Sequence, residues 1–312
     1  MAGPVVLTGG TGLVGGALLP ELGAGGHPVR ALVRGERRPE GVEAFAWDGL
    51  HPPPAALAGA ETVVHLSGEP VFGGPPTAAR RERLRTSRVA STRAFVTALG
   101  ELAETERPKS FLCASAVGYY GDRGDEILTE AAPPGEGLLA DLCVDWEAAA
   151  AEAERHGLRV CSFRIGVVLS KRGGALPRMV RPFRLGLGGR LGGGRQWFPW
   201  IHLEDLVALL RTATDDAHFR GVVNAVAPSP VRNGELTHAL ARAVSRPAIL
   251  PVPAFAVRAA LGPLAVELLG SKRVVPERAL ALGFEFRHPE LAGALRAEVG
   301  PSRARGDAEG PG

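Results

Sequence analysis

A glycine-rich turn near the N-terminus most constrains the fold of this 312-residue chain. Val5–Thr8 is a short, mostly apolar run of the kind buried in parallel sheets, and Gly9, Gly12 and Gly15 follow it with the spacing G-x-x-G-x-x-G. Residues 14–22 then carry the apolar pattern of a helix. In such a strand–turn–helix unit the backbone approaches a pyrophosphate and the first helical N–H groups point at it. The turn therefore predicts an α/β fold that begins with a nucleotide site.

Strand and helix patterns continue to alternate after this unit. Further strands are expected at Val29–Val33, 61–66, 110–114, 160–165 and 222–226, and helices at 80–102, 138–155, 203–212 and 233–245, the last with Asn233 as its N-cap. This alternation is typical of a Rossmann-like doubly wound parallel sheet. We place the nucleotide-binding domain at 1–232, with a glycine-rich flap at about 171–199, a small C-terminal substrate lobe at 233–300 and a disordered tail at 301–312.

The composition narrows the classes of function. The formal net charge is only +3, and the arginines are mostly interleaved with acids, whereas a nucleic-acid-binding protein needs a concentrated basic face. No run approaches ~20 apolar residues, so no membrane span is expected. Cys113, Cys143 and Cys161 have neither zinc-ligand nor disulfide spacing. We therefore expect a cytoplasmic monomer or homodimer with reduced thiols, a small-molecule substrate and no metal.

The end of the second predicted strand indicates which nicotinamide cofactor is bound. An Asp or Glu there would bind the ribose 2′-hydroxyl of NAD, but this chain has Leu32, Val33 and Arg34. A guanidinium at this place suits a 2′-phosphate, although the missing acid is the better evidence because loop arginines are common. The sequence thus predicts NADP(H). Asp48, further along, either meets the adenine or forms a turn.

Several motifs resemble one family, the atypical extended short-chain dehydrogenase/reductases. The motifs are the turn at 9–15, ASAVGYYG at 114–121, DWEAAA at 145–150, FRLGLGG at 183–189, FPWIH at 198–202, RVVP at 273–276 and LGFEF at 282–286. The most similar subgroup is usually labelled an NAD(P)-dependent epimerase family protein and sometimes a cell-division inhibitor. The last two motifs look like that subgroup's own C-terminal domain, and the resemblance covers about residues 3–296.

The resemblance implies an NADP-bound Rossmann core and names the residues around the cofactor. These are the turn residues Gly9, Gly10, Thr11, Gly12, Leu13, Val14 and Gly15, then Arg34, the backbone at Leu66 and Ser67, Arg88, and the backbone near Val168 beside the nicotinamide. A surface position on its helix is the alternative for Arg88.

The usual acid–base pair of this superfamily is missing. Most members place a Tyr and a Lys four residues apart on one helix face, where the lysine lowers the tyrosine pKa. No Tyr-x-x-x-Lys exists in this chain, and Cys143 and Glu147 stand where the pair belongs. Cys143 is expected to be a packed thiol, because the charge of Glu147 would raise its pKa.

The candidate catalytic residues are therefore Ser115, Tyr119 and Tyr120. Ser115 stands at the strand end where the superfamily has a substrate-orienting serine, and each tyrosine either donates a hydrogen bond or simply packs. Acids on the same loop, for which we favour surface solvation, are Asp122, Asp125, Glu126 and Glu130. His202 precedes a helix with Asp205 in its first turn, and a structural hydrogen bond is favoured over catalysis.

Two functions remain open. One is an NADP(H)-dependent epimerase or oxidoreductase with an unusual acid–base set, which acts on a carbonyl or sugar-like substrate. The other is a non-catalytic NADP(H)-binding sensor or regulator. The flap and the C-terminal lobe favour the enzyme, whereas the missing Tyr–Lys pair favours the sensor. A division-related interaction protein rests on a family label alone.

Overall fold

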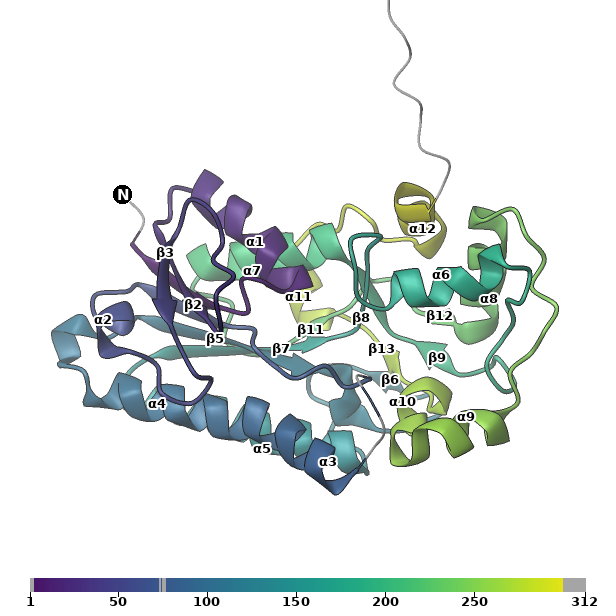
Figure 1. Ribbon diagram of the computed structural model, residues 1–312, viewed down its shortest axis with the longest axis horizontal. Coiled ribbons are helices and arrows are strands. Elements are labelled where there is room, and N and C mark those ends of the chain that lie inside the picture. Colours follow the sequence, from purple (N-terminus) through teal and green to yellow (C-terminus); the bar gives the residue numbers. More distant parts are fainter. Residues whose placement is uncertain (1–2, 73, 75–76, 300–312) are drawn as a thin grey trace, which may run out of the picture.

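A seven-stranded, fully parallel sheet organises the structure (Figure 1). The computed structural model describes residues 3–72, 74 and 77–299, so the tail predicted at 301–312 lies outside the described residues. The strand order is β11-β7-β5-β4-β1-β2-β3. The strands are β1 (Val5–Thr8), β2 (Val29–Val33), β3 (Glu43–Ala46), β4 (Thr62–His65), β5 (Ser110–Ala116), β7 (Arg159–Ile165) and β11 (Gly221–Ala225). This order confirms the predicted Rossmann-like sheet.

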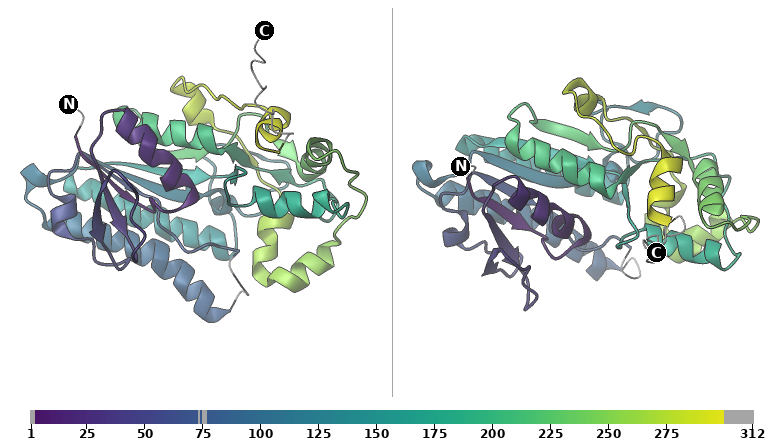
Figure 2. Two further views of the ribbon diagram at one scale, coloured as in Figure 1. Left: turned by 45° about the horizontal axis from the view of Figure 1, so that its top comes forward. Right: turned by 90° about the horizontal axis from the view of Figure 1, so that it is seen from above.

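Helices cover both faces of the sheet, because alternate side chains of β1 are apolar and point to opposite faces. Val5 and Leu7 pack with α1 (Leu13–Ala24) and α7 (Leu203–Asp215), whereas Val6 points into the opposite core. That opposite core is closed by α4 (Ser91–Glu101) and α5 (Leu138–Ala151). Figure 2 shows α1 and α7 side by side over one face, at the same side as the glycine turn. The short helix α2 (Pro54–Leu57) lies before β4.

The single helix predicted at 80–102 is interrupted. It consists of α3 (Ala78–Arg85), a π-helical turn at Thr86–Ala90 and α4. Short π-helical segments are frequently found at functional sites because they rotate the following side chains. Here the turn carries Ser87 and Arg88, which bind the loop after β4.

The C-terminal lobe is assembled from segments far apart in the sequence. Its helices are α6 (Leu176–Arg184), α8 (Asn233–Ala243), α9 (Ala254–Leu261), α10 (Val266–Leu269) and α12 (Leu291–Val299). Its short strand pairs are β8 (Val167–Leu169) with β10 (Trp200–His202), β9 (Trp197–Phe198) with β12 (Val231–Arg232), and β6 (Ile127–Leu128) with β13 (Arg273–Val274). The lobe core joins Leu169, Phe183, Trp200, Leu240 and Leu295. By contrast, α11 (Glu277–Ala281) packs Ala279 into the core under the main sheet.

The segment predicted as a glycine-rich flap contains α6 and β9, which were not predicted. The prediction of Asn233 as an N-cap was wrong, because Asn233 is the first residue of α8 and Arg232 is the N-cap. The Asn233 side chain instead accepts a hydrogen bond from the Leu191 backbone N–H, 2.9 Å away, and so holds the flap to α8. Among the residues that the structure describes, no helix is both long and apolar enough to span a bilayer.

Candidate functional site

The glycine turn forms a tight cradle at the C-terminal ends of β1 and β4. Gly9 has a φ of +74°, and a Cβ on it would lie 3.1 Å from the carbonyl carbon of Leu66. The Gly12 N–H donates to the Gly9 carbonyl at 2.9 Å. A Cβ on Gly15 would lie 2.3 Å from that same carbonyl oxygen. Gly12 is also the N-cap of α1 and has no side chain to satisfy the first amides, which suits an anion.

A buried Thr8–His65 pair positions the loop opposite the cradle. Thr8 Oγ1 accepts hydrogen bonds from the backbone N–H groups of Leu66, at 3.0 Å, and Ser67, at 3.1 Å. Its single hydroxyl proton is therefore donated to His65 Nδ1, 2.9 Å away. This bond leaves the His65 proton on Nε2, toward Ser91 Oγ at 3.5 Å. The pair was not predicted from the sequence. The available signal was that Thr8 and His65 each end a predicted strand, which places them opposite each other when the two strands pair in register.

We expect His65 to make the protein acid-sensitive. Burial lowers the pKa of His65 from 6.5 to about 3, so between these values the unfolded chain binds a proton that the folded one does not. Stability then falls as the pH drops below about 6.5, by up to roughly 1.4 kcal/mol per pH unit. Urea unfolding between pH 5 and pH 7 measures this slope.

Two histidine substitutions test the source of that slope. In His65→Gln the unfolded chain no longer binds the extra proton at this position. The free energy of unfolding should therefore depend less steeply on pH. His218→Gln, at an exposed histidine, serves as the control and should leave it unchanged. An unflattened slope in His65→Gln would contradict the assignment.

A pocket of about 260 Å³ lies at the ends of β2 and β4 and reaches Ser67, next to the cradle. Arg34 and Ser67 line it, together with Trp47 and the π-helical turn residues Thr86 and Ser87. Trp47 is buried, and its indole Nε1 has no hydrogen-bond partner among the described residues. Arg34 is exposed and pairs with no described carboxylate. A free cation and an orphaned donor fit a phosphorylated adenosine.

Asp48 in this pocket forms a turn. Its Oδ1 accepts from the backbone N–H groups of Leu50 and His51, both at 2.8 Å. The hydrogen bond from the His51 side chain, followed by these two, lowers the pKa of Asp48 below its usual range. Of the two roles expected for Asp48, contact with the adenine or formation of a turn, the geometry supports the turn.

Two further predicted cofactor residues, Arg88 and Val168, lie outside the lining of this pocket. Arg88 Nη2 donates to the Glu69 carbonyl at 3.0 Å, and its guanidinium lies beside Gly68 and over the Trp146 ring. Burial lowers the Arg88 pKa from its usual value. Val168 stands on β8, and Gly174 lies close to both Val168 and Leu13: a Cβ on Gly174 would be 3.8 Å from the Val168 carbonyl oxygen and 2.9 Å from Leu13 at the start of α1.

A charged cluster occupies the place of the usual acid–base pair. Ser115 Oγ donates to Glu147 Oε1 at 2.6 Å. Arg164 binds the same carboxylate bidentately, from Nε at 2.9 Å and from Nη2 at 2.8 Å. Ser115 and Arg164 are paired neighbours on β5 and β7, and α5 brings Glu147 over both. Burial alone would lower the pKa of Arg164, but the hydrogen bonds and charge of Glu147 raise it overall.

The two tyrosines differ in their surroundings. The Tyr120 hydroxyl is fully buried, accepts from Arg164 Nη1 at 2.9 Å and lies 2.7 Å from Asn224 Oδ1. Burial raises the pKa of Tyr120 to about 12, so this hydroxyl serves the core. Tyr119 is half-buried, with its ring centroid 3.3 Å from Arg164 Cζ. Burial and then the charge of Glu147 raise the Cys143 pKa to about 12, as expected of a packed thiol.

Three of the loop acids, Asp122, Asp125 and Glu126, are exposed, as expected, and Glu130 is half-buried. All four also accept hydrogen bonds from other residues. Asp125 accepts from Trp197 Nε1 at 2.7 Å, and Glu130 accepts from the Asn224 N–H at 2.9 Å. Asp122 accepts from the Ser271 N–H, and Glu126 pairs with Arg123. The contacts of Asp122 and Asp125 join the loop after β5 to the C-terminal lobe, whereas Glu130 binds β11 of the main sheet.

His202 has the structural role that the sequence favoured. Its Nδ1 accepts from the Glu204 N–H at 3.2 Å and caps α7. Its Nε2 lies 3.0 Å from Glu298 Oε1, but the pair lacks hydrogen-bond alignment. Burial, then the neighbouring His288, lowers the His202 pKa. His202, Glu204 and His288 lie close enough to hold a metal, yet the bond at Nδ1 keeps the proton on Nε2 and leaves that nitrogen without a free lone pair.

Comparisons with known proteins agree with this geometry. Residues 5–225 match the NAD dependent epimerase/dehydratase family, and residues 252–298 match a domain of unknown function, DUF1731. The chain is 38% identical to an Arabidopsis thaliana protein named "Epimerase family protein SDR39U1 homolog, chloroplastic", over 94% of this chain and 86% of that one.

Two solved structures are similar over nearly the whole chain. The human epimerase family protein SDR39U1 (isoform 2), crystallised with NADPH, has a TM-score of 0.85 and 34% identity over 95% of this chain and 99% of that chain. A nucleoside-diphosphate sugar epimerase from Corynebacterium glutamicum has a TM-score of 0.79 and 38% identity over 96% of this chain and 59% of that chain.

Proposed function

Because the chain belongs to the NAD dependent epimerase/dehydratase family, we propose that it is an NADP(H)-dependent enzyme of the epimerase or oxidoreductase type. The observation that carries this proposal is the pocket at the end of β2, where the strand ends in Val33 and Arg34 and not in an acid, and where Arg34 pairs with no described carboxylate. The presence of NADPH in the human structure supports the same cofactor.

Named residues of this chain would hold the cofactor. The amides of the Gly9–Gly15 turn face the pyrophosphate, and Arg34 faces the 2′-phosphate. The backbone at Leu66 and Ser67, fixed by Thr8, borders the ribose. When bound, the nicotinamide supplies or accepts a hydride.

Ser115, Glu147 and Arg164 are the residues proposed to handle the proton. Ser115 already donates to Glu147, so a substrate hydroxyl bound to Ser115 Oγ can pass its proton to the serine as the serine passes its own to Glu147. Arg164 donates two hydrogen bonds to Glu147 and so holds its carboxylate in place beside Ser115. Tyr119, the more exposed tyrosine, is the second hydrogen-bond donor proposed for the substrate.

One observation favours the alternative, a cofactor-binding sensor. Ser115 is 3% exposed, and protein donors already occupy both oxygens of Glu147. Incubation with NADPH and a panel of carbonyl substrates distinguishes the two functions by NADPH consumption. Isotope exchange into a sugar-like substrate covers an epimerase, which consumes no net cofactor. If the protein turns substrate over, and Ser115→Ala loses this turnover but keeps its affinity for NADPH, the enzyme is supported. If the protein binds NADPH tightly but shows neither turnover nor exchange, the sensor is supported.

Cofactor selectivity should depend on Arg34. We expect Arg34→Gln to weaken NADPH binding about 10- to 100-fold, because a charged hydrogen bond to the 2′-phosphate contributes roughly 1.5–3 kcal/mol. NADH binding should stay within about twofold, since NADH lacks that phosphate. Fluorescence titration of both cofactors measures this, with Arg93→Gln on the exposed side of α4 as the control. Equal losses for NADPH and NADH would contradict the role of Arg34.

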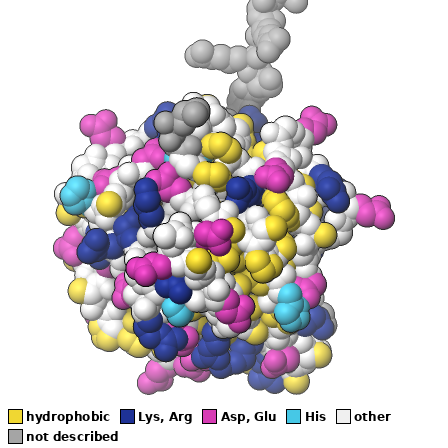
Figure 3. Space-filling view, turned by 90° about the vertical axis from the view of Figure 1, so that its left-hand side faces the viewer, with side chains coloured by type: hydrophobic (Ala, Val, Ile, Leu, Met, Phe, Trp, Pro, Cys, Tyr) yellow, Lys and Arg dark blue, Asp and Glu magenta, His cyan; other side chains and the backbone are white. Residues whose placement is uncertain are grey.

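We further propose that the protein is a cytoplasmic monomer or homodimer that acts on a small molecule, without nucleic-acid or membrane partners. Over most of the face in Figure 3, Lys and Arg side chains lie among Asp and Glu, which does not favour a polyanionic duplex there. Size-exclusion chromatography with light scattering tests the oligomeric state.

A further inference from the structure

The segment 171–195 in the C-terminal lobe is strongly and one-sidedly basic. It contains no Asp or Glu, and its cations are Lys171, Arg172, Arg178, Arg181, Arg184, Arg190 and Arg195. All of these side chains are exposed. Three of them, at i, i+3 and i+6, lie along α6, whose opposite side buries Leu176, Val180 and Phe183 in the lobe core. Such a helix repels itself unless anions lie nearby.

These cations lack the ion pairs that several other arginines have. Elsewhere Arg80, Arg123, Arg164 and Arg211 each have a carboxylate within ion-pair distance. Within the described ranges, no carboxylate pairs with any cation of 171–195. The segment therefore presents positive charge that the rest of the described fold does not neutralise.

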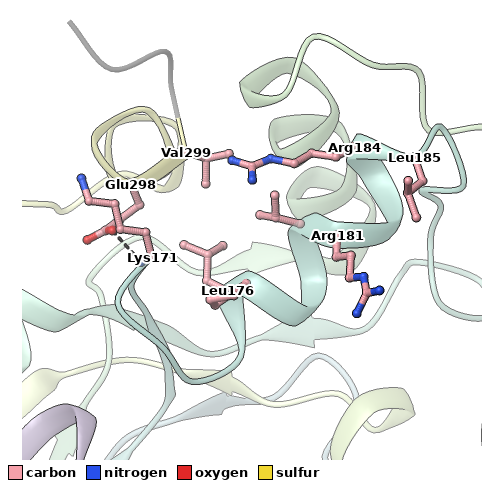
Figure 4. Close-up of a pocket in the computed structure, with 9 residues that line it drawn as sticks. Lys171, Leu176, Arg181, Arg184, Leu185, Glu298 and Val299 are labelled. Carbon is pink, nitrogen blue, oxygen red and sulfur yellow. Dashed lines mark hydrogen bonds between the residues drawn. The ribbon is translucent and has the colours of Figure 1, made fainter. Parts of the chain in front are cut away.

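A cavity of about 440 Å³ lies between α6 and α12 beside these charges (Figure 4). Its walls are mostly apolar and include Leu176, Val180, Leu185 and Val299. Lys171, Arg181 and Arg184 also line it. In Figure 4 the Arg184 side chain extends from α6 across to Val299 on α12, so its guanidinium lies next to the apolar wall.

The one acid that lines this cavity does not neutralise its cations. Glu298 Oε2 accepts from the Lys171 backbone N–H at 2.6 Å, and Oε1 lies 3.0 Å from His202 Nε2. The Glu298 carboxylate is thus engaged on the side of the cavity away from α6 (Figure 4). An apolar cavity of this volume with cations at its edge matches a ligand that is apolar at one end and anionic at the other.

We propose that the cavity between α6 and α12 binds an amphipathic anion, with its apolar body against Leu176, Val180 and Val299 and its carboxylate or phosphate on Arg184, Arg181 and Lys171. This cavity shares no lining residue with the pocket that contains Arg34, so the proposal does not depend on the cofactor. The residues that follow Val299 in the sequence include no Val, Leu, Ile, Met or aromatic residue that would match the apolar wall.

Isothermal titration with single-chain probes tests the proposal on the full chain. Decanoate and decyl phosphate, at monomeric concentrations, should bind with one site per chain, and the stronger of the two identifies the headgroup. Decyltrimethylammonium has the same chain length and the opposite charge, and acetate has the charge without the chain. Both should bind at least about tenfold more weakly, and added salt should weaken decanoate binding.

Variants locate the site. Arg184→Gln should weaken the better anion about tenfold or more, because the charged donor is lost. Leu185→Gln, at an exposed position of the wall, should weaken it without unfolding the lobe. Arg93→Gln is the matched arginine control and should change nothing, and NADPH affinity should be the same in all variants. Equal binding of the ammonium probe, unchanged binding in Arg184→Gln, or displacement of decanoate by NADPH would each overturn the proposal.

Discussion

Replacing Gly15 with alanine is expected to reduce NADPH affinity more than 100-fold. The new Cβ would lie 2.3 Å from the Gly9 carbonyl oxygen, 2.7 Å from its carbon and 3.0 Å from Gly10 Cα, all backbone atoms that no rotamer change can move. The turn must therefore open, and its amides leave the pyrophosphate position. The strain should also lower the free energy of unfolding by about 1–3 kcal/mol. Cofactor titration and urea unfolding measure the two effects.

The same substitution at Gly23, on the same helix, is the control. A Cβ there meets nothing within 4 Å, and alanine is favoured over glycine in a helix by up to about 1 kcal/mol. Gly23→Ala should thus be neutral or slightly stabilising and keep full NADPH affinity. If Gly15→Ala bound NADPH like the parent protein, the turn would not be the pyrophosphate site.

The sheet was predictable because each central strand can be recognised from its own short stretch of sequence. Central strands such as β1 and β4 are short apolar runs, and glycines or helix patterns end them. The edge strand β3 (Glu43–Ala46) was missed because its apolar stretch is short and contains no β-branched residue, and because both of its end residues are exposed. Helix α6 was missed because glycines surround it, although Leu176, Val180 and Phe183 have the helical spacing i, i+4, i+7.

The cofactor motif was local, but the rest of the site depends on pairing between distant segments. The position of Glu147 followed from the family spacing, whereas its partner Arg164 lies on the neighbouring strand, opposite Ser115 in the register. Thr8 and His65 likewise meet only because β1 and β4 pair in parallel. Periodicity predicts elements, not registers, so these contacts were outside its reach.

Breaking the Arg164–Glu147 pair should have the largest effect on stability. Arg164→Met would leave the Glu147 carboxylate, whose side chain is 12% exposed, with Ser115 as its remaining donor, and would remove a donor to the Tyr120 hydroxyl. Removing one partner of a buried ion pair costs about 3–5 kcal/mol, because the other charge stays buried without compensation. Urea unfolding at pH 7 should show this loss, and Glu147→Leu alone should show a similar one.

The double variant decides whether the loss comes from the uncompensated charge. Arg164→Met combined with Glu147→Leu removes both charges. Its loss in free energy of unfolding should therefore be smaller than the sum of the two single losses, by a coupling energy of about 1–3 kcal/mol. The exposed pair Arg155–Glu152 is the control, and its disruption should cost at most about 1 kcal/mol. Simple additivity of the two single changes would show that Arg164 and Glu147 do not act as a pair, and the proton relay proposed through Ser115 would then lose the group that orients the Glu147 carboxylate.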